Sequence, residues 1–111
     1  MKINALKNEK VWFHMKGNTI YIQGEIDGLN PESYLNDFFN QVAKDFPGEL
    51  IIDLTELSYL NSRAISSFIA FLSKRKPENR IYFKINEKFG WQKRSIEILA
   101  SLDPQHITIL S

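Results

Sequence analysis

The sequence of 111 residues contains no cysteine. This excludes a disulfide framework, a thiolate metal site and a cysteine nucleophile, and it is compatible with a reducing compartment. Long apolar runs are also missing. No stretch approaches the roughly 18 apolar residues that cross a membrane, and the start, MKINALKNEK, lacks the apolar core of a signal peptide. We therefore expect a cytoplasmic protein without a membrane segment.

An excess of charge of one sign is absent as well. The 14 basic and 13 acidic residues give a formal net charge of +1 and are interspersed along the chain. Such a balance produces no strong field that would recruit nucleic acid or anionic lipid. The one concentrated cationic run, KRK at residues 74–76, falls where a helix is expected to end. Basic side chains there complement the helix dipole, so we favour helix capping over nucleic-acid binding.

What is present is the composition of one folded domain. Hydrophobic residues make up 43% of the chain and charged residues 24%, which is typical of globular proteins. A chain of this length can bury a core without metals or disulfides. No repeat or internal linker divides the sequence, which predicts a single domain over residues 1–111 with no cofactor and no metal.

The first half of the chain alternates strand and helix patterns. VWFHMKGNTIYIQGEI, residues 11–26, is typical of two strands joined by a tight turn at residues 16–18. Asn30, Pro31 and Glu32 then form a helix-start signal, and the helical pattern ends at residues 46–48. The apolar run at residues 50–52 is typical of a strand buried on both faces of a sheet.

The second half repeats the alternation. A helix is expected from Ser62 to residues 74–77, and its core-facing stripe is Ile65, Phe68, Ile69 and Leu72. Strands are expected at residues 81–85 and 106–110, with a helix between them, at residues 91–102, anchored by Ile98, Leu99 and Leu102. Alternating strands and helices imply right-handed βαβ crossovers. The predicted fold is α/β, with an N-terminal β-hairpin, βαβ units and a mixed sheet flanked by helices.

A search for catalytic groups finds one weak arrangement. The sequence has no Gly-rich phosphate loop and no G-x-S-x-G elbow, and His14 and His106 lack motif spacing. Asp27 and Asp53 each follow a predicted strand, and at one sheet edge they could meet Ser62 as the acid and base of a small hydrolase. The alternative is that both acids form turns. We favour turns and expect a protein that is not an enzyme.

The polar cluster at Asn61 and Ser62 interrupts the most apolar part of the chain. Asn is a good N-cap, and Ser in the first turn can satisfy another free N–H group, so the cluster can simply start a helix. A helix N-terminus is also an anion site. A phosphate on Ser62 would be accommodated there and would change the surface that a partner meets.

The order of three motifs gives the chain a family likeness. GEID at residues 24–27, IIDLTEL at 51–57 and YLNSRAISSFIAFL at 59–72 resemble the STAS family, the sulfate transporter and anti-sigma factor antagonist domain. The likeness covers nearly the whole chain. Each motif is short, so the weight lies in their order and spacing. The resemblance implies a STAS-like fold and a regulatory domain that docks to a protein partner.

The resemblance also implies particular site residues. In the anti-sigma factor antagonist branch, a switch kinase phosphorylates the serine at the start of the second helix and a phosphatase reverses this. Ser62 matches that serine, Asp27 matches the acid beside it, and Asp53 and Thr55 match residues after the strand. The implied docking surface adds Asn61, Arg63, Ala64, Ser66 and Phe71. Phe71 lies off the apolar stripe, where it either offers an apolar contact or is partly buried.

The motif at the helix start differs from the usual Asp-Ser-Ser/Thr-Gly-Leu. Here it is Asn-Ser-Arg-Ala-Ile at residues 61–65. The cation of Arg63 could pair with a phosphate on Ser62, or its bulk could keep a kinase away. Ala64 adds a Cβ where glycine allows close approach. A second branch needs no phosphorylation: a cytoplasmic STAS subunit that binds the ATPase of a lipid-transport ABC system.

Overall fold

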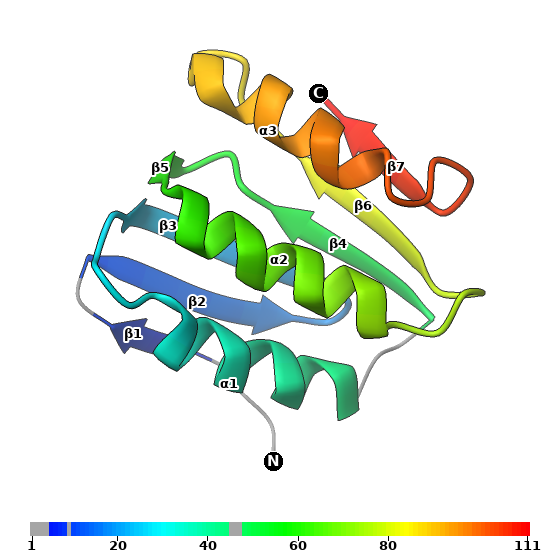
Figure 1. Ribbon diagram of the computed structural model, residues 1–111, viewed down its shortest axis with the longest axis horizontal. Helices are drawn as coiled ribbons and strands as arrows, with labels where there is room; N and C mark the ends of the chain where they lie inside the picture. Colours follow the sequence, from blue (N-terminus) through cyan, green and yellow to red (C-terminus); the bar gives the residue numbers. More distant parts are fainter. Residues whose placement is uncertain (1–4, 9, 45–47) are drawn as a thin grey trace.

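The computed structural model describes residues 5–8, 10–44 and 48–111. Within these ranges a mixed sheet forms one layer and three helices form the other (Figure 1). The strands are β1 (Ala5–Asn8), β2 (Val11–Lys16), β3 (Thr19–Ile26), β4 (Glu49–Asp53), β5 (Leu57–Leu60), β6 (Arg80–Lys84) and β7 (Ile107–Leu110). The helices are α1 (Glu32–Lys44), α2 (Ser62–Lys74) and α3 (Gly90–Ala100). The expected end of the first helix at Phe46 and Pro47 lies outside the described residues.

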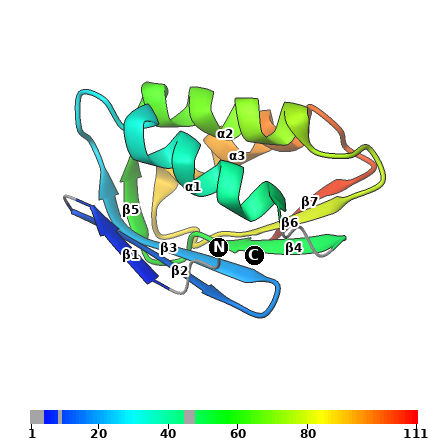
Figure 2. The same ribbon diagram turned by 90° about the horizontal axis from the view of Figure 1, so that it is seen from below.

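The sheet order explains why the helices share one face. The strands follow the order β1-β2-β3-β4-β6-β7, with β5 paired to β3 off this path. β1, β2 and β3 are antiparallel, whereas β3, β4, β6 and β7 are parallel. Each crossover moves to the next strand in the same direction, so the right-handed rule places every helix on the same side. Figure 2 shows this arrangement. The predicted fold class is confirmed.

The core lies between the sheet and the helices. Phe13, Phe38, Phe68 and Phe83 are fully buried there. The opposite face of the sheet carries no helix in the part of the chain that is described, so Ile51 of β4 stays partly exposed. The expectation that this strand is buried on both faces was wrong, because all the crossovers run the same way round.

Two further expectations about the helices need correction. Ile98 and Leu102 do not anchor the third helix: Ile98 is 61% exposed, and the buried apolar positions of α3 are Ile96 and Leu99. In α2 the expected core positions Phe68 and Leu72 are confirmed, but the rest of the buried face is turned from the expected stripe. Ala64, Ser67 and Phe71 are buried, whereas Ile65 and Ile69 are only partly so. The reason is that α2 packs on α1 as well as on the sheet.

The cationic run after α2 is part of the fold. The helix ends at Lys74, and the side chain of Arg75 is buried. Its guanidinium donates to Asp103 and to the carbonyls of Lys76, Pro77 and Asn79. Hydrogen bonds from Arg75 and then from His106 hold the pKa of Asp103 below its ordinary value. Arg75 therefore ties the end of α2 to the loop before β7.

No helix of the described residues is long and apolar enough to cross a membrane.

Candidate functional site

The start of α2 is positioned by a parallel strand pair. Leu60 at the end of β5 lies opposite Ile26 at the end of β3, and the Asn61 N–H donates to the Ile26 carbonyl at 3.0 Å. Asp27 and Ser62 follow these paired ends by one and two residues. Both therefore lie at the same edge of the sheet.

Gly24 makes this pairing possible. The first half of β3 pairs with β4, where Tyr21 lies opposite Asp53, and the second half pairs with β5, where Gly24 lies opposite Leu57. The change of partner coincides with an irregularity in the register between Gly24 and the next residue. Gly24 has φ of +104°, a conformation that residues with a Cβ rarely adopt. The position of β5, and of the helix that follows it, depends on this residue.

Asn61 joins two segments through its side-chain amide. The residue is the N-cap of α2, with extended backbone angles, and its Oδ1 accepts from the Ala64 N–H at 3.0 Å. Its Nδ2 donates to the Gly28 carbonyl at 2.8 Å. The predicted capping role is present. In addition, the amide fastens the loop between β3 and α1 to the helix start.

Replacing Asn61 by Asp is expected to lower the free energy of unfolding by about 1 kcal/mol, although Asp is as good an N-cap as Asn. The carboxylate can still accept from Ala64 but cannot donate to Gly28, so two oxygens would face each other. Urea denaturation at neutral pH measures the difference. Asn36→Asp, at an exposed position of α1, is the control. Unchanged stability of the Asn61 variant would show that the bond to Gly28 contributes nothing.

Ser62 and Arg63 present different groups at the edge. Ser62 is the first residue of α2 and is exposed, and within the described chain its hydroxyl makes no hydrogen bond. Arg63 turns toward the neighbouring loop. Its Nη1 donates to the Leu29 carbonyl at 2.7 Å, and its Nε lies 3.8 Å from Glu32 Oε1. The cation next to Ser62 is thus already engaged.

Two exposed apolar side chains flank the helix start, and sequence reasoning did not find them. Leu29, in the loop held by Asn61 and Arg63, is 88% exposed, and Tyr59 of β5 is 47% exposed. An apolar residue between Gly28 and Asn30 could have been noticed in the sequence, because a turn there gives it no core to enter. The Leu29 carbonyl bonds to Arg63 at the helix start, and Tyr59 stands three residues before Ser62, so both are available to a partner that contacts this end of α2.

Two of the expected docking residues are buried, and a third stays exposed. Ala64 is fully buried, so its Cβ meets the core rather than a partner. Phe71 is buried too and stacks on Phe39 with ring centroids 4.5 Å apart, so it offers no exposed apolar contact. Ser66 is exposed, and its hydroxyl donates weakly to the Ser62 carbonyl at 3.4 Å.

The two carboxylates do not come together. Asp53 is nearly buried and accepts from the N–H of Thr55 at 2.9 Å and from its hydroxyl at 2.6 Å, so it forms a turn. It lies level with Tyr21, six residues before Asp27, which corresponds to about 20 Å along β3. Asp27 pairs instead with Lys10 at 3.4 Å. The favoured turn is therefore present at Asp53, and the alternative in which both acids meet Ser62 was wrong, because the register of β3 keeps the two carboxylates apart.

A buried glutamine supports the turn before β5. Gln92 of α3 is fully buried, and its Nε2 donates to the carbonyls of Leu54 and Leu57 at 2.6 and 2.7 Å. Its Oε1 accepts from the Asn86 N–H at 2.8 Å. The sequence indicates the burial of Gln92 only weakly, through its position four residues before Ile96 on the same face of the helix.

Across the described residues, no three acidic, histidine or cysteine side chains gather as a metal site.

Comparison with known proteins adds one finding. No family model and no curated protein matches the chain. Among solved structures, it is similar to the crystal structure of an anti-sigma factor antagonist from Mycobacterium paratuberculosis, with a TM-score of 0.68 and 18% sequence identity. The match covers 91% of this chain and 85% of that one. At this level of identity the likeness shows the fold, which is the fold that the three motifs implied.

Proposed function

We propose that this chain is a cytoplasmic, non-enzymatic regulator of the STAS family that docks to a protein partner in the manner of an anti-sigma factor antagonist. One observation carries the proposal. Ser62 presents an unbonded hydroxyl on the first residue of α2, and the exposed side chains of Leu29 and Tyr59 flank that helix start. The docking surface consists of Asp27, Leu29, Tyr59, Ser62 and Arg63.

Phosphorylation of Ser62 is the proposed control of docking. A phosphate on the first residue of a helix is favoured by the free N–H groups and by the dipole, so the fold would tolerate it. Its charge of about −1.5 to −2 would be added at the same helix start as the exposed apolar side chains and would oppose their burial by a partner. A kinase of the anti-sigma factor type would add the phosphate, and a phosphatase would remove it.

Replacing Ser62 by Asp is expected to reduce recovery of the partner from native extract about tenfold, which corresponds to roughly 1.4 kcal/mol of lost binding free energy. The negative charge is added where the apolar contacts are made. The measurement is quantitative mass spectrometry of proteins captured by the wild type and by the variant. Ser73→Asp, at an exposed position near the other end of α2, is the matched control.

Equal recovery by the wild type and the Ser62 variant would refute the phosphorylation switch. If the wild type captures no protein, the docking proposal itself fails. The intact mass of the chain purified from its own cells adds a direct readout, because a phosphorylated fraction mapped to Ser62 cannot come from an inert scaffold.

A second candidate function is a subunit that docks to the ATPase of a lipid-transport ABC system without phosphorylation. One observation favours this candidate. Arg63 already bonds to the Leu29 carbonyl and pairs with Glu32, so its cation is less available to hold a phosphate. An ATPase as the captured protein, with equal recovery by Ser62→Asp, would support this candidate. The separation of Asp27 from Asp53 removes the geometric support for a hydrolase.

A further inference from the structure

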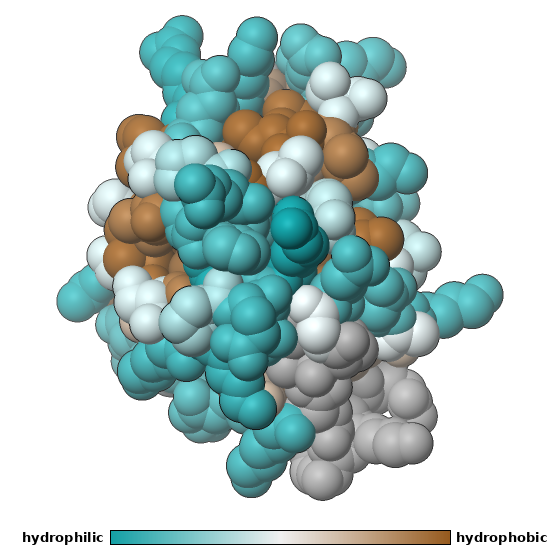
Figure 3. All heavy atoms as spheres, turned by 90° about the vertical axis from the view of Figure 1, so that its right-hand side faces the viewer, coloured by the Kyte–Doolittle hydropathy of each residue, from teal (hydrophilic) through white to brown (hydrophobic). Residues whose placement is uncertain are grey.

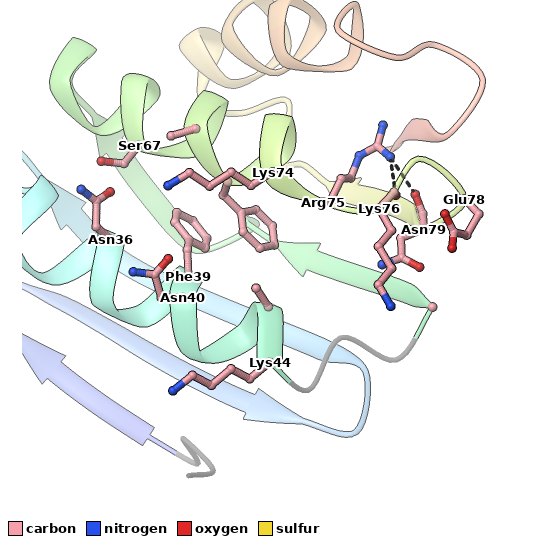
Figure 4. Close-up of a pocket in the computed structure, with 14 residues that line it drawn as sticks. Asn36, Phe39, Asn40, Lys44, Ser67, Lys74, Arg75, Lys76, Glu78 and Asn79 are labelled. Atoms are coloured by element: carbon pink, nitrogen blue, oxygen red, sulfur yellow. Dashed lines mark hydrogen bonds between the residues drawn. The ribbon is translucent and has the colours of Figure 1, made fainter.

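A groove runs between α1 and α2, away from Ser62 and toward the C-terminal ends of the two helices (Figure 4). Its volume is about 510 Å³. The stacked rings of Phe39 and Phe71 lie between the helices in this groove. Its polar lining comes from both helices and from the loop after α2: Asn36, Asn40, Lys44, Ser67, Lys74, Arg75, Lys76, Glu78 and Asn79.

Two hydrogen-bond donors in this lining have no partner among the described residues. Ser67 is only 4% exposed, and among the described residues its hydroxyl makes no hydrogen bond. In Figure 4 it points from α2 toward Asn36 on α1. Arg75 lines the same groove, and its Nε is buried without a partner in the described chain. The unpaired hydroxyl of Ser67 can bond to a ligand in the groove, whereas the guanidinium of Arg75 is directed to Asp103 and to the loop carbonyls.

The remaining polar side chains point to the same chemistry. The amides of Asn36 and Asn40 make no hydrogen bond within the described residues, and the side chain of Lys74 runs along the groove between the helices (Figure 4). Among the described residues, four cationic side chains and one acidic side chain, Glu78, line the groove, and the cation of Arg75 is paired with Asp103. Figure 3, which faces the loop after α2, shows hydrophilic residues over most of that side. Such a lining complements an acidic ligand that is rich in acceptors.

The shape of the groove favours an extended chain over a compact metabolite. A second hollow of about 330 Å³ shares Asn36, Ser67 and Ala70 with the groove and extends to Glu32 and Arg63. The combined depression therefore follows much of α2, a length of about 20 Å. A small-molecule site is usually enclosed, whereas an extended peptide presents alternating N–H and C=O groups that asparagine amides can pair with.

We infer that the groove between α1 and α2 binds an extended acidic segment of a partner protein. A carboxylate of the segment pairs with Lys74, and its backbone bonds to Asn36, Asn40 and the unpaired hydroxyl of Ser67. This contact runs along α2 and shares only Arg63 with the docking surface at Ser62, so it does not depend on phosphorylation there.

A displayed library of random peptides, each about 12 residues long, tests the inference on the full chain, because such peptides can span the groove. We expect the enriched peptides to be rich in Asp and Glu and to bind Lys74→Glu at least about tenfold more weakly. Lys93→Glu, at an exposed position of α3 outside the groove, makes the same charge change and should bind like the wild type.

Ser67→Ala separates binding from folding. Removing an unpaired hydroxyl is expected to leave the free energy of unfolding nearly unchanged, while peptide binding weakens several-fold. A structural hydroxyl would instead lower the stability when removed. Ser62→Asp should keep peptide binding, so failure of the switch and failure of the groove are distinguishable.

The inference is overturned if no peptide is enriched, if the enriched peptides are not acidic, or if Lys74→Glu and Lys93→Glu weaken binding equally. Loss of peptide binding in Ser62→Asp would place the peptides at the helix start and would also overturn it. A competition experiment with inorganic phosphate tests whether the groove binds small anions. If phosphate alone displaces the peptides and shifts the amide resonances of Ser67 and Lys74, the groove is a site for small anions instead.

Discussion

Gly24→Ala is expected to lower the free energy of unfolding by at least about 3 kcal/mol, through backbone strain and a backbone clash together. The glycine has φ of +104°, and a Cβ built on it would lie 2.0 Å from the Lys10 carbonyl oxygen and 3.3 Å from Val11 Cα. These are main-chain atoms that cannot rotate away. The antiparallel pair β2 and β3 would have to separate, or the irregularity in β3 would have to straighten.

The substitution at Gly24 would also disturb the candidate site at the start of α2. The N–H of Gly24 donates to the Glu56 carbonyl at 3.0 Å, and its own carbonyl accepts from the Ser58 hydroxyl at 3.0 Å. Both bonds hold the segment that contains β5, and β5 leads directly into α2. Partner binding should therefore fall together with stability in this variant. In Ser62→Asp, by contrast, binding should fall while stability is kept.

Urea denaturation and thermal melting measure the effect, and 3 kcal/mol corresponds to a fall of more than about 10 °C in Tm for a domain of this size. Gly17→Ala is the matched control. Gly17 has φ of +61°, but nothing lies within 4 Å of an added Cβ, so the cost should be only about 1 kcal/mol. Equal losses in the two variants would show that the close approach to Lys10 is unimportant.

The sequence predicted those parts of the fold that are determined by adjacent residues, and it did not predict those that depend on contacts between distant residues. The tight turn at Gly17 and the cap at Asn61 are signals carried by adjacent residues, and both elements lie where they were expected. β5 escaped prediction because Leu57 to Leu60 shows no alternation of buried and exposed residues. Its strand character comes from pairing with β3, which depends on the distant Gly24.

The candidate site was also predicted only where adjacent residues determine it. The helix-start signal identified Ser62, but the engagement of Arg63 depends on how the loop after β3 lies against α2. The register of β3 could not be predicted from the sequence either, and this register separates Asp53 from Asp27. In α3, the true buried face includes the polar residue Gln92, so a search for apolar spacing selected Ile98 instead.

Gln92→Leu is expected to lower the free energy of unfolding by about 2–4 kcal/mol. Leucine fills nearly the same volume, so the loss comes from hydrogen bonds and not from a cavity. The carbonyls of Leu54 and Leu57 and the N–H of Asn86 each lose a buried partner. Gln105→Leu, at an exposed loop position, is the control and should stay within about 0.5 kcal/mol of the wild type in urea denaturation.

Gln92→Glu makes the same argument testable by pH. The ionised carboxylate can accept from Asn86 but cannot donate to Leu54 or Leu57, whereas the protonated acid can donate one bond. Burial would raise the pKa of this carboxyl in the folded state above its unfolded value of about 4.3, so the deficit relative to the wild type should shrink as pH falls through the raised value. A deficit that does not change with pH, or a fully stable Gln92→Leu, would refute the role of this side chain. Because the turn it holds leads into β5 and the start of α2, loss of Gln92 should weaken partner binding only as far as it unfolds the chain.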